Sequence, residues 1–215
     1  ILGSRERVKQ IIVSELREVM KKYGKPRRSM LIYPNELPQE AEEEEVPDYP
    51  VHLFFSRDGY FKKITPQSLR MSGEQKLKEG DEMKQQLDAS NNCDLLFFTD
   101  RCQVYKAKAS DFADTKASVL GEYIPARLGM EEGELAVFMA VTKDYSGYML
   151  FFFENGKLAK IDMNAYATKT NRKKLTGAFS DKSPLACAFH ADQDAEYLLK
   201  SSAGRLLLVH TGSVA

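Results

Sequence analysis

The sequence predicts a mainly β protein of about four blade-like repeats, which need not all be complete, preceded by one N-terminal α-helix and an acidic linker that contains proline. Three observations lead to this prediction. Apolar residues recur at helical spacing near the N-terminus, a run of acidic residues without a basic one follows, and four similar hairpin patterns fill the rest of the chain. The length of 215 residues fits one domain of ordinary size with a small attached helix.

The first segment predicts a helix over about residues 5–23. Seven apolar residues recur there at spacings of three and four, which places them in one stripe: Val8, Ile11, Ile12, Leu16, Val19, Met20 and Tyr23. Ser4 can cap the N-terminus, Gly24 permits a left-handed stop, and Pro26 cannot continue a helix. An isolated helix of this length is marginal in water, so we expect its stripe to dock on another part of the protein or on a partner.

The zero net charge, from 31 basic and 31 acidic residues, hides three segments of different sign. Residues 1–30 carry nine basic and three acidic residues, whereas residues 31–50 carry seven acidic residues and none that is basic. Residues 51–215 are nearly balanced, with 22 basic and 21 acidic residues. The middle segment also holds four of the eight prolines, so we expect an extended linker with little regular structure between about Pro34 and Pro50.

From residue 51 onward, four hairpin patterns resemble one another: an apolar strand, a polar turn that usually contains Gly, and a second apolar strand. The copies begin near residues 51, 94, 148 and 197, and they align when four apolar residues are taken as equivalent: Phe54, Phe97, Phe151 and Leu199. The resulting spacings of 43, 54 and 48 residues are typical of propeller-like arrays.

Further strands are predicted between the hairpins, over residues 135–141 and 185–189, so each repeat would hold three or four strands. An irregular β-sandwich whose hairpins are similar by chance is the alternative architecture. Four aligned hairpins are hard to obtain by chance, which favours the repeated blades.

Composition excludes several classes of protein. With 43% hydrophobic and 29% charged residues the chain is neither a disordered tail nor a supercharged protein, and no stretch approaches the roughly 18–20 apolar residues of a membrane span. The N-terminus lacks a signal-peptide pattern, and the three cysteines show no C-x-x-C spacing, which favours reduced thiols in a cytosol. Independent catalysis is not expected, because the sequence has no G-x-S-x-G, Walker or clustered His/Cys motif.

Particular segments give the chain a resemblance to the A-type subunit of bacterial type IIA topoisomerases, DNA gyrase and topoisomerase IV. Two segments before the linker resemble the end of its coiled-coil arm: residues 11–16 (IIVSEL) and 22–28 (KYGKPRR). Four later segments resemble its C-terminal β-pinwheel: residues 58–66 (DGYFKKITP), 96–105 (LFFTDRCQVY), 123–128 (YIPARL) and 131–134 (EEGE). Together these segments span nearly the whole chain.

The resemblance implies that residues 1–30 end the coiled-coil arm, residues 31–50 form the linker and residues 51–215 form a DNA-binding β-pinwheel. It also implies a piece of a longer enzyme, an ATP-hydrolysing type IIA DNA topoisomerase whose catalytic tyrosine lies upstream, so none of these residues would cut DNA. No cofactor or metal is expected in this chain, because ATP and Mg²⁺ would bind other parts of the holoenzyme.

The same resemblance implies the partners and the location of the chain. The expected partners are double-stranded DNA, the ATPase B subunit of an A2B2 assembly, and the rest of the A subunit. The chain itself is expected to be a monomer without contact to a membrane, in the bacterial cytoplasm at the nucleoid.

DNA wrapping needs Lys and Arg along a rim more than it needs base-specific contacts. The first candidates lie in a Thr- and Asn-rich connection whose side chains can also bond phosphate oxygens: Lys169, Arg172, Lys173 and Lys174. Weaker candidates lie on predicted strands and after the first hairpin: Lys62, Lys63, Arg70, Lys76, Lys78, Lys106 and Lys108. A solvated loop is the alternative for the connection, and lysines on strand edges also serve to prevent aggregation.

The chain departs from gyrase after the first hairpin, where gyrase has a Q-R-R-G-G-K-G-like box that tight wrapping needs. Residues 70–81 (RMSGEQKLKEGD) keep two glycines, lack the paired arginines and add Glu74, Glu79 and Asp81. Phosphate binding should be weaker, which favours a topoisomerase IV-like role: non-specific DNA binding and bending that steers the transported segment during ATP-dependent strand passage.

Two alternatives stay open for the function. The chain could come from a true gyrase A subunit with weak wrapping, or it could be a propeller-like protein-interaction module without DNA binding, which the near-neutral charge of residues 51–215 allows. The acidic run at residues 42–45 is a solvated spacer in the simplest interpretation. It could instead compete with DNA for a basic rim at high effective concentration.

Overall fold

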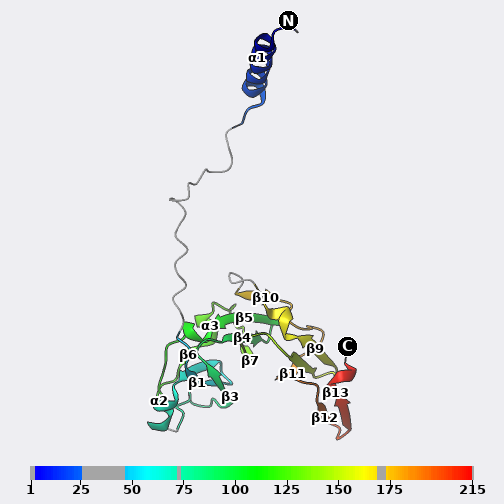
Figure 1. Cartoon of the computed structure of the whole chain (residues 1–215). Coiled ribbons are helices and arrows are strands. Elements are labelled where there is room, and N and C mark those ends of the chain that lie inside the picture. The colour runs from blue at the N-terminus through cyan, green and yellow to red at the C-terminus, as the bar shows by residue number, and fades with distance from the viewer. Residues whose placement is uncertain (1–2, 26–46, 72–73, 169–172, 215) are drawn as a thin grey trace. The chain divides into compact units, whose positions relative to one another are not determined.

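The computed structural model describes residues 3–25, 47–71, 74–168 and 173–214. The chain divides into two compact units, Ile1–Glu44 and Glu45–Ala215, and each is described by itself (Figure 1). The expected linker lies outside the described residues except for its last four, and of these Pro50 already belongs to the first strand. Among the helices of the described ranges, none is long and apolar enough to cross a membrane.

The described part of the first unit is a single helix, α1 (Arg5–Tyr23), which confirms the predicted helix. Its ends differ in detail from the expectation. Ser4 has the extended backbone of an N-cap, but its side chain makes no capping hydrogen bond, and Gly24 has a φ of −62° instead of a left-handed value. No residue of α1 is buried, and Met20 in the apolar stripe is 68% exposed.

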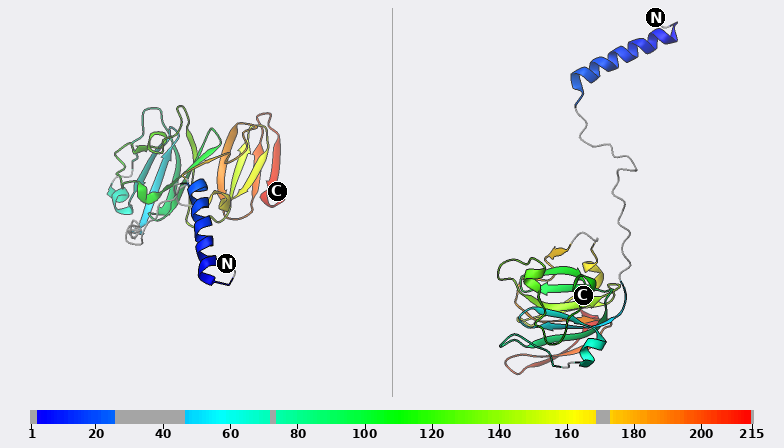
Figure 2. Two further views of the ribbon diagram at one scale, coloured as in Figure 1. Left: turned by 90° about the horizontal axis from the view of Figure 1, so that it is seen from above. Right: turned by 90° about the vertical axis from the view of Figure 1, so that its left-hand side faces the viewer.

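The second unit consists of four antiparallel sheets that follow one another along the chain (Figure 2). Sheet 1 has the order β3-β1-β2-β6 and contains β1 (Pro50–Ser56), β2 (Tyr60–Ile64), β3 (Met83–Ser90) and β6 (Glu122–Tyr123). Sheet 2 has the order β10-β5-β4-β7 and contains β4 (Asp94–Thr99), β5 (Gln103–Lys108), β7 (Ala136–Thr142) and β10 (Lys174–Thr176). Sheet 3 has the order β11-β8-β9 and contains β8 (Tyr148–Phe153), β9 (Leu158–Asp162) and β11 (Leu185–Ala191). Sheet 4 pairs β12 (Glu196–Lys200) with β13 (Leu206–His210).

Short helical turns lie in the connections between strands. They are the α-helical turns α2 (Pro66–Met71) and α3 (Ile124–Arg127) and the 3₁₀ turns η1 (Ala109–Asp111), η2 (Met163–Tyr166) and η3 (Thr211–Ser213).

Each sheet is built on one hairpin, to which later parts of the chain add the outer strands. The long strand that follows each of the first three hairpins pairs with the first strand of that hairpin: β3 with β1, β7 with β4, and β11 with β8. A short strand from beyond the next hairpin pairs with the second strand: β6 with β2, and β10 with β5. Sheets 1 and 2 are therefore completed by strands from the repeat that succeeds them, which links neighbouring blades.

The hairpin registers confirm the alignment of the repeats. The four residues taken as equivalent each pair with the residue eight positions later: Phe54 with Lys62, Phe97 with Tyr105, Phe151 with Ala159, and Leu199 with Leu207. The additional strands predicted over residues 135–141 and 185–189 are present as β7 and β11.

Neighbouring sheets pack face to face through aromatic residues on the first strands of the hairpins, where successive side chains point to opposite faces of the sheet. The ring of Phe97 lies 5.8 Å from that of Phe55 in sheet 1, whereas the next residue, Phe98, faces the opposite side and lies 5.5 Å from Phe151 in sheet 3. One buried core thus joins sheets 1 and 2, and a second joins sheets 2 and 3.

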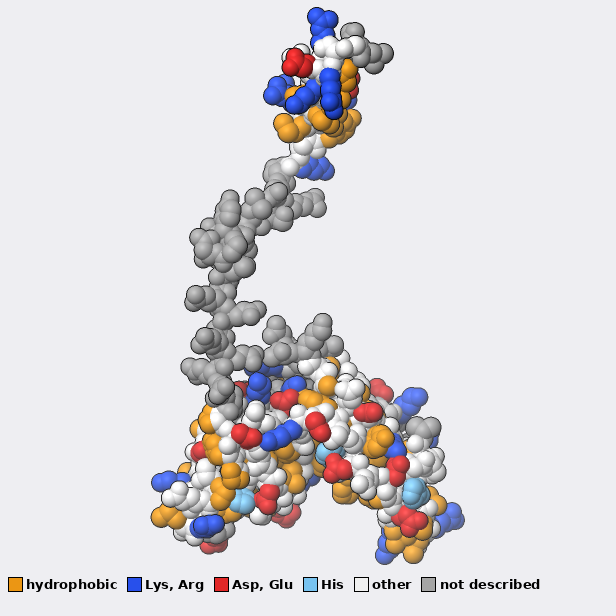
Figure 3. Space-filling model, in the orientation of Figure 1, with side chains coloured by type: hydrophobic (Ala, Val, Ile, Leu, Met, Phe, Trp, Pro, Cys, Tyr) orange, Lys and Arg blue, Asp and Glu red, His pale blue; other side chains and the backbone are white. Residues whose placement is uncertain are grey.

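The two ends of this stack differ. The outer side of sheet 1 is covered, because Phe54 and Ile64 form a small buried cluster with Ala117. Sheet 4 packs one side on sheet 3, where the rings of Phe152 and Tyr197 are 5.4 Å apart. Its other side exposes three leucines, Leu198, Leu206 and Leu208, to between 60% and 64%. Figure 3 shows hydrophobic side chains gathered where β12 and β13 lie.

The architecture is mainly β, with four hairpin-based blades and one N-terminal helix, as predicted. The β-sandwich alternative is wrong, because the described strands form four small sheets joined by separate cores and not two sheets around one core. Sheet 4 differs from the expected three or four strands per repeat, since it has two in the part of the chain that the structure describes.

Candidate nucleic-acid interface

Lys62 lies inside sheet 1 and not on a rim. The residue is 2% exposed, and its ammonium group donates to Gln75 Oε1 (3.1 Å) and to the backbone carbonyls of Lys76 (2.8 Å) and Ala117 (3.2 Å). Burial lowers the pKa of Lys62 below its ordinary value, because the charged form loses hydration. All three N–H donors are used, so Lys62 holds two connections against β2 and has no donor left for a phosphate.

Three other lysines occupy equivalent positions in the second strands of the first three hairpins. Each meets one aspartate and one tyrosine ring: Lys63 with Asp114 and Tyr49, Lys106 with Asp94 and Tyr145, and Lys160 with Asp194 and Tyr148. The Nζ–Oδ distances are 3.2, 2.9 and 2.6 Å, and the ammonium groups lie 5.9, 4.7 and 4.1 Å from the ring centroids. We call these groups the Lys–Asp–Tyr sets. The fourth hairpin has Leu208 at the equivalent position.

These contacts bear on part of the predicted interface. Lys62 and Lys63 are buried, so their ammonium groups are not accessible to a phosphate in this structure. The side chain of Lys106 is 21% exposed, and Asp94 already neutralises its charge. The sequence pattern could not show this, because a lysine on a strand looks like a surface residue until the connections that cover it are known.

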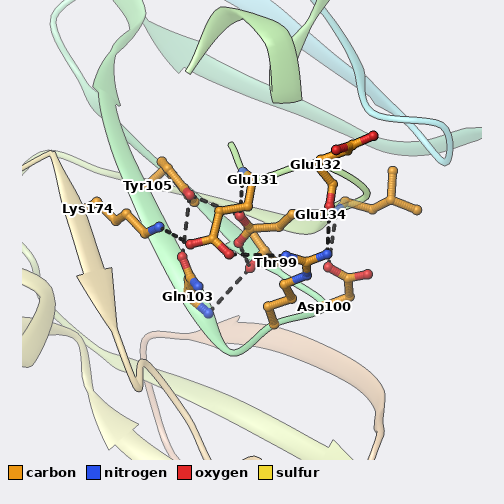
Figure 4. A network of polar contacts seen from close by, with 10 residues as sticks. Thr99, Asp100, Gln103, Tyr105, Glu131, Glu132, Glu134 and Lys174 are labelled. Atoms are coloured by element: carbon orange, nitrogen blue, oxygen red, sulfur yellow. Dashed lines mark hydrogen bonds and ion pairs between the residues drawn. The ribbon is translucent and has the colours of Figure 1, made fainter. Parts of the chain in front are cut away.

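Lys174, on β10, belongs to a polar network beside the second hairpin turn (Figure 4). Its ammonium group donates to Glu131 Oε1 at 2.8 Å and lies 5.3 Å from the ring centroid of Tyr105, while Arg101 binds the other oxygen of Glu131 at 3.1 Å. The hydrogen bond between Glu131 and Lys174 raises the pKa of the lysine and lowers that of the glutamate. The charge of Lys174 is therefore already compensated.

Next to this pair, the buried carboxylate of Glu134 anchors the loop that leads into β7. It accepts hydrogen bonds from Thr99 Oγ1 (2.5 Å), Tyr105 Oη (3.0 Å) and the backbone N–H of Glu131 (3.0 Å). The glutamates of this loop therefore fix it to the hairpin of sheet 2, and they partly neutralise the basic side chains around them.

Lys108 and Lys173 are the candidates on sheet 2 whose side chains stay exposed and make no ion pair within the described ranges. The carbonyl of Lys173 accepts the N–H of Lys106 at 2.8 Å, so its backbone is fixed to β5 while its ammonium group faces solvent. Lys169 and Arg172 lie outside the described residues.

The stretch after the first hairpin provides a second exposed group. Arg70 at the end of α2 and Lys76 are exposed, and their charged groups make no ion pair in the part of the chain that is described. Lys78 is exposed as well, with its Nζ 3.9 Å from Asp58 Oδ2. The predicted set is thus divided between four structural lysines, five exposed residues and two residues outside the described ranges.

A recess on sheet 2 adds a basic residue that the sequence did not single out. It has a volume of about 330 Å³ and is lined by Tyr105, Lys106, Ala107, Asp111, Phe112, Arg127, Leu128 and Lys173. Arg127 lies on α3 and Lys173 lies just before β10, so only the pairing of β10 with β5 brings them to one place. No spacing in the sequence signals this proximity.

Known proteins resemble the chain in sequence over its whole length. No family model matches it. Over 220 positions the chain is 23% identical to the A subunit of DNA topoisomerase 4 from Staphylococcus aureus, a match that covers all of this chain and 28% of that protein. The chain is homologous to the A subunit of topoisomerase IV. It spans little more than a quarter of the length of these relatives.

Solved structures agree on the fold. The chain matches the C-terminal domain of DNA topoisomerase IV with a TM-score of 0.65 and 23% identity, over 76% of this chain and 52% of that one. It matches the E. coli ParC C-terminal domain with a TM-score of 0.58 and 17% identity, over 76% of this chain and 65% of that one. It matches the DNA gyrase A C-terminal domain with a TM-score of 0.52 and 16% identity, over 78% and 56%. These matches confirm the predicted β-pinwheel.

Proposed function

We propose that the chain is the DNA-binding C-terminal part of the A subunit of a type IIA topoisomerase, and that it holds and bends duplex DNA without reading its sequence. The observation that carries this proposal is the homology to the topoisomerase IV A subunit over the whole chain together with the β-pinwheel fold. The exposed cations on the blades, Arg70, Lys76, Lys108 and Lys173, supply groups that can contact phosphates.

Binding of this kind would be weak and sensitive to salt. Several lysines are held by protein carboxylates, and the stretch over residues 70–81 brings acidic side chains next to Lys76 and Lys78. Weak binding suits a topoisomerase IV-like role in which the pinwheel steers the transported segment while other parts of the enzyme cut DNA and use ATP and Mg²⁺. In this proposal the chain is a monomer on its own and works in an A2B2 assembly with the ATPase B subunit, in the bacterial cytoplasm at the nucleoid.

Two measurements test this function. Fluorescence anisotropy with two labelled duplexes of about 40 base pairs and unrelated sequence should give the same affinity within about threefold, because phosphate contacts carry no sequence information. Ligation of a nicked plasmid in the presence of the protein should shift the linking number only slightly. An affinity difference of more than tenfold between the duplexes, or no binding at low salt, would argue against the proposal.

A protein-interaction module is the second candidate, and the exposed leucines of sheet 4 are the observation that favours it. A DNA titration of wild type separates the two, and the double variant Leu206→Lys/Leu208→Lys tests the part played by sheet 4. The double variant should leave DNA affinity unchanged or slightly higher if the chain is a DNA-binding pinwheel. If the chain instead binds other polypeptides through sheet 4, wild type should show no DNA binding at all in the same titration.

A further inference from the structure

Resting on the proposed function, we infer that the recess between β5, α3 and the start of β10 is a seat for one backbone phosphate of duplex DNA. Its contacts would be Arg127 and Lys173. The inference goes beyond a general basic rim, because it assigns one phosphate to one place and adds a residue from a different connection.

Arg127 is held in position before any ligand arrives. Its Nε lies 2.9 Å from Glu122 Oε2, and its Nη2 donates to the backbone carbonyl of Asp111 at 2.8 Å. The guanidinium carbon also lies 5.8 Å from the ring centroid of Phe112. The remaining Nη1 has no partner among the described residues, so the fixed guanidinium of this lining residue keeps one nitrogen with unused donors.

Lys173 complements Arg127 from the other side. Its backbone is pinned to β5 by the hydrogen bond from Lys106, and its exposed ammonium group makes no ion pair within the described ranges. Lys106 also lines the recess, but Asp94 compensates its charge. Glu122 likewise pairs with Arg127, so Arg127 contributes its unused Nη1 donor and Lys173 contributes the uncompensated positive charge. The two residues approach one recess from separate elements, as a phosphate contact requires.

Asp111 is the acidic residue of the recess, and it gives the inference a sharp test. One of its carboxylate oxygens accepts the backbone N–H of Lys108 at 3.2 Å. Asparagine can accept the same hydrogen bond without the charge. Asp111→Asn should therefore tighten DNA binding while Arg127→Gln and Lys173→Gln weaken it.

The experiment measures anisotropy of a labelled 40-base-pair duplex with the full chain at several salt concentrations. Arg127→Gln and Lys173→Gln should each weaken binding, and the double variant should flatten the slope of log K against log salt by about 0.9, since the two residues share one phosphate and each neutralised phosphate contributes about 0.9. Asp111→Asn should tighten binding by about twofold to fivefold at low salt, a direction expected from removal of a like charge next to the phosphate.

Controls come from the turn between β8 and β9, which carries an exposed residue of each sign. Lys157→Gln and Glu154→Gln change the net charge as the recess variants do, and they should alter affinity by less than about twofold. Lys173→Gln removes no hydrogen bond or ion pair of that side chain to the described residues, so it tests the seat even if Arg127→Gln loosens α3. Thermal melting of each variant identifies such loosening.

The outcomes separate this inference from the function on which it rests. If wild type binds DNA but the recess variants behave like the Lys157 and Glu154 controls, the phosphate seat is refuted and the DNA-binding function stands. If wild type does not bind DNA even at low salt, both fail together.

Discussion

At the scale of single residues, the Lys–Asp–Tyr sets show how a lysine on a strand can serve the fold. The same position in three successive hairpins carries Lys63, Lys106 and Lys160, and in each case an aspartate from another segment reaches it. In two sets the tyrosine hydroxyl donates to that aspartate, Tyr49 at 2.9 Å and Tyr145 at 2.5 Å. In the first and third sets the ion pair therefore fixes the strand to a connection, which carries Asp114 or Asp194, whereas in the second set it joins β5 to β4 of the same hairpin.

Replacing Lys106 with Met tests this role. Asp94 would lose its cation while only the Tyr145 hydroxyl still donates to it, so the free energy of unfolding should fall by about 1–3 kcal/mol. Lys108→Met, at an exposed position on the same strand, should change it by less than about 0.5 kcal/mol. Urea unfolding followed by circular dichroism measures both, and equal stabilities of the two variants would refute the structural role.

The pKa of Asp81 leads to a prediction about how the stability of the fold depends on pH. Burial raises its pKa, but hydrogen bonds from Ser56 and from the backbone N–H groups of Asp58 and Glu82, together with the charge of Arg57, outweigh burial and hold the pKa below its ordinary value. The ionised carboxylate thus stabilises the fold above the unfolded pKa of about 3.9, and this contribution is lost as pH falls through the lower folded pKa.

Asp81→Asn should therefore lower the melting temperature at pH 7. Between pH 4 and pH 2 the melting temperature of the variant should fall less than that of wild type. Melting curves over that range, with Glu79→Gln as an exposed control in the same loop, measure the difference. Parallel curves for wild type and Asp81→Asn would show that this carboxylate does not contribute.

At the scale of elements, neighbouring phenylalanines of β4 face opposite sides of sheet 2 and so join it to sheets 1 and 3. Phe98→Ala should destabilise the second unit by about 3–5 kcal/mol, because Phe98 is fully buried between sheets 2 and 3. Leu206→Ala on sheet 4 should cost less than about 0.5 kcal/mol, since the side chain is 62% exposed. Chemical denaturation distinguishes them, and a comparable cost for Leu206→Ala would mean that this face of sheet 4 is covered in solution.

The hairpins could be predicted from the sequence because their signals are local. In each hairpin the apolar runs and the turn residues lie within a dozen positions. The strand registers agree with the alignment of Phe54, Phe97, Phe151 and Leu199. The outer strands β6 and β10 were not predicted. Each pairs with a hairpin strand far away in the chain, and two or three residues such as Glu122 and Tyr123 carry no recognisable strand pattern.

For the candidate site, the sequence could predict the type of residue but not which of these residues are exposed or where they lie. Basic residues were expected to contact DNA, and Lys108 and Lys173 remain exposed as that role requires. Burial of Lys62 and the recess position of Arg127 depend on contacts between segments far apart in the chain, which composition and spacing do not report.

At the scale of the whole molecule, we expect the total charge to influence DNA affinity more than any one contact does. The chain is neutral overall, and many of its described lysines and arginines are already paired with carboxylates. Figure 3 shows acidic and basic side chains interspersed on one face of the second unit. Under the proposed function, such a surface would hold DNA through a few exposed cations and not through a continuous basic stripe. Its affinity for DNA should therefore be low, and the slope of log K against log salt should be smaller than for a protein with many phosphate contacts.

The measurement that tests this account most directly is the affinity of the full wild-type chain for a labelled 40-base-pair duplex as a function of salt. Log K should fall linearly with log salt at a slope of about −2.7 or steeper, which corresponds to at least three phosphates, one of them in the seat of Arg127 and Lys173 and the others at exposed cations such as Lys108 and Lys76. A slope near zero, or no detectable binding at the lowest salt concentration, would contradict the claim that this pinwheel binds DNA through its exposed cations.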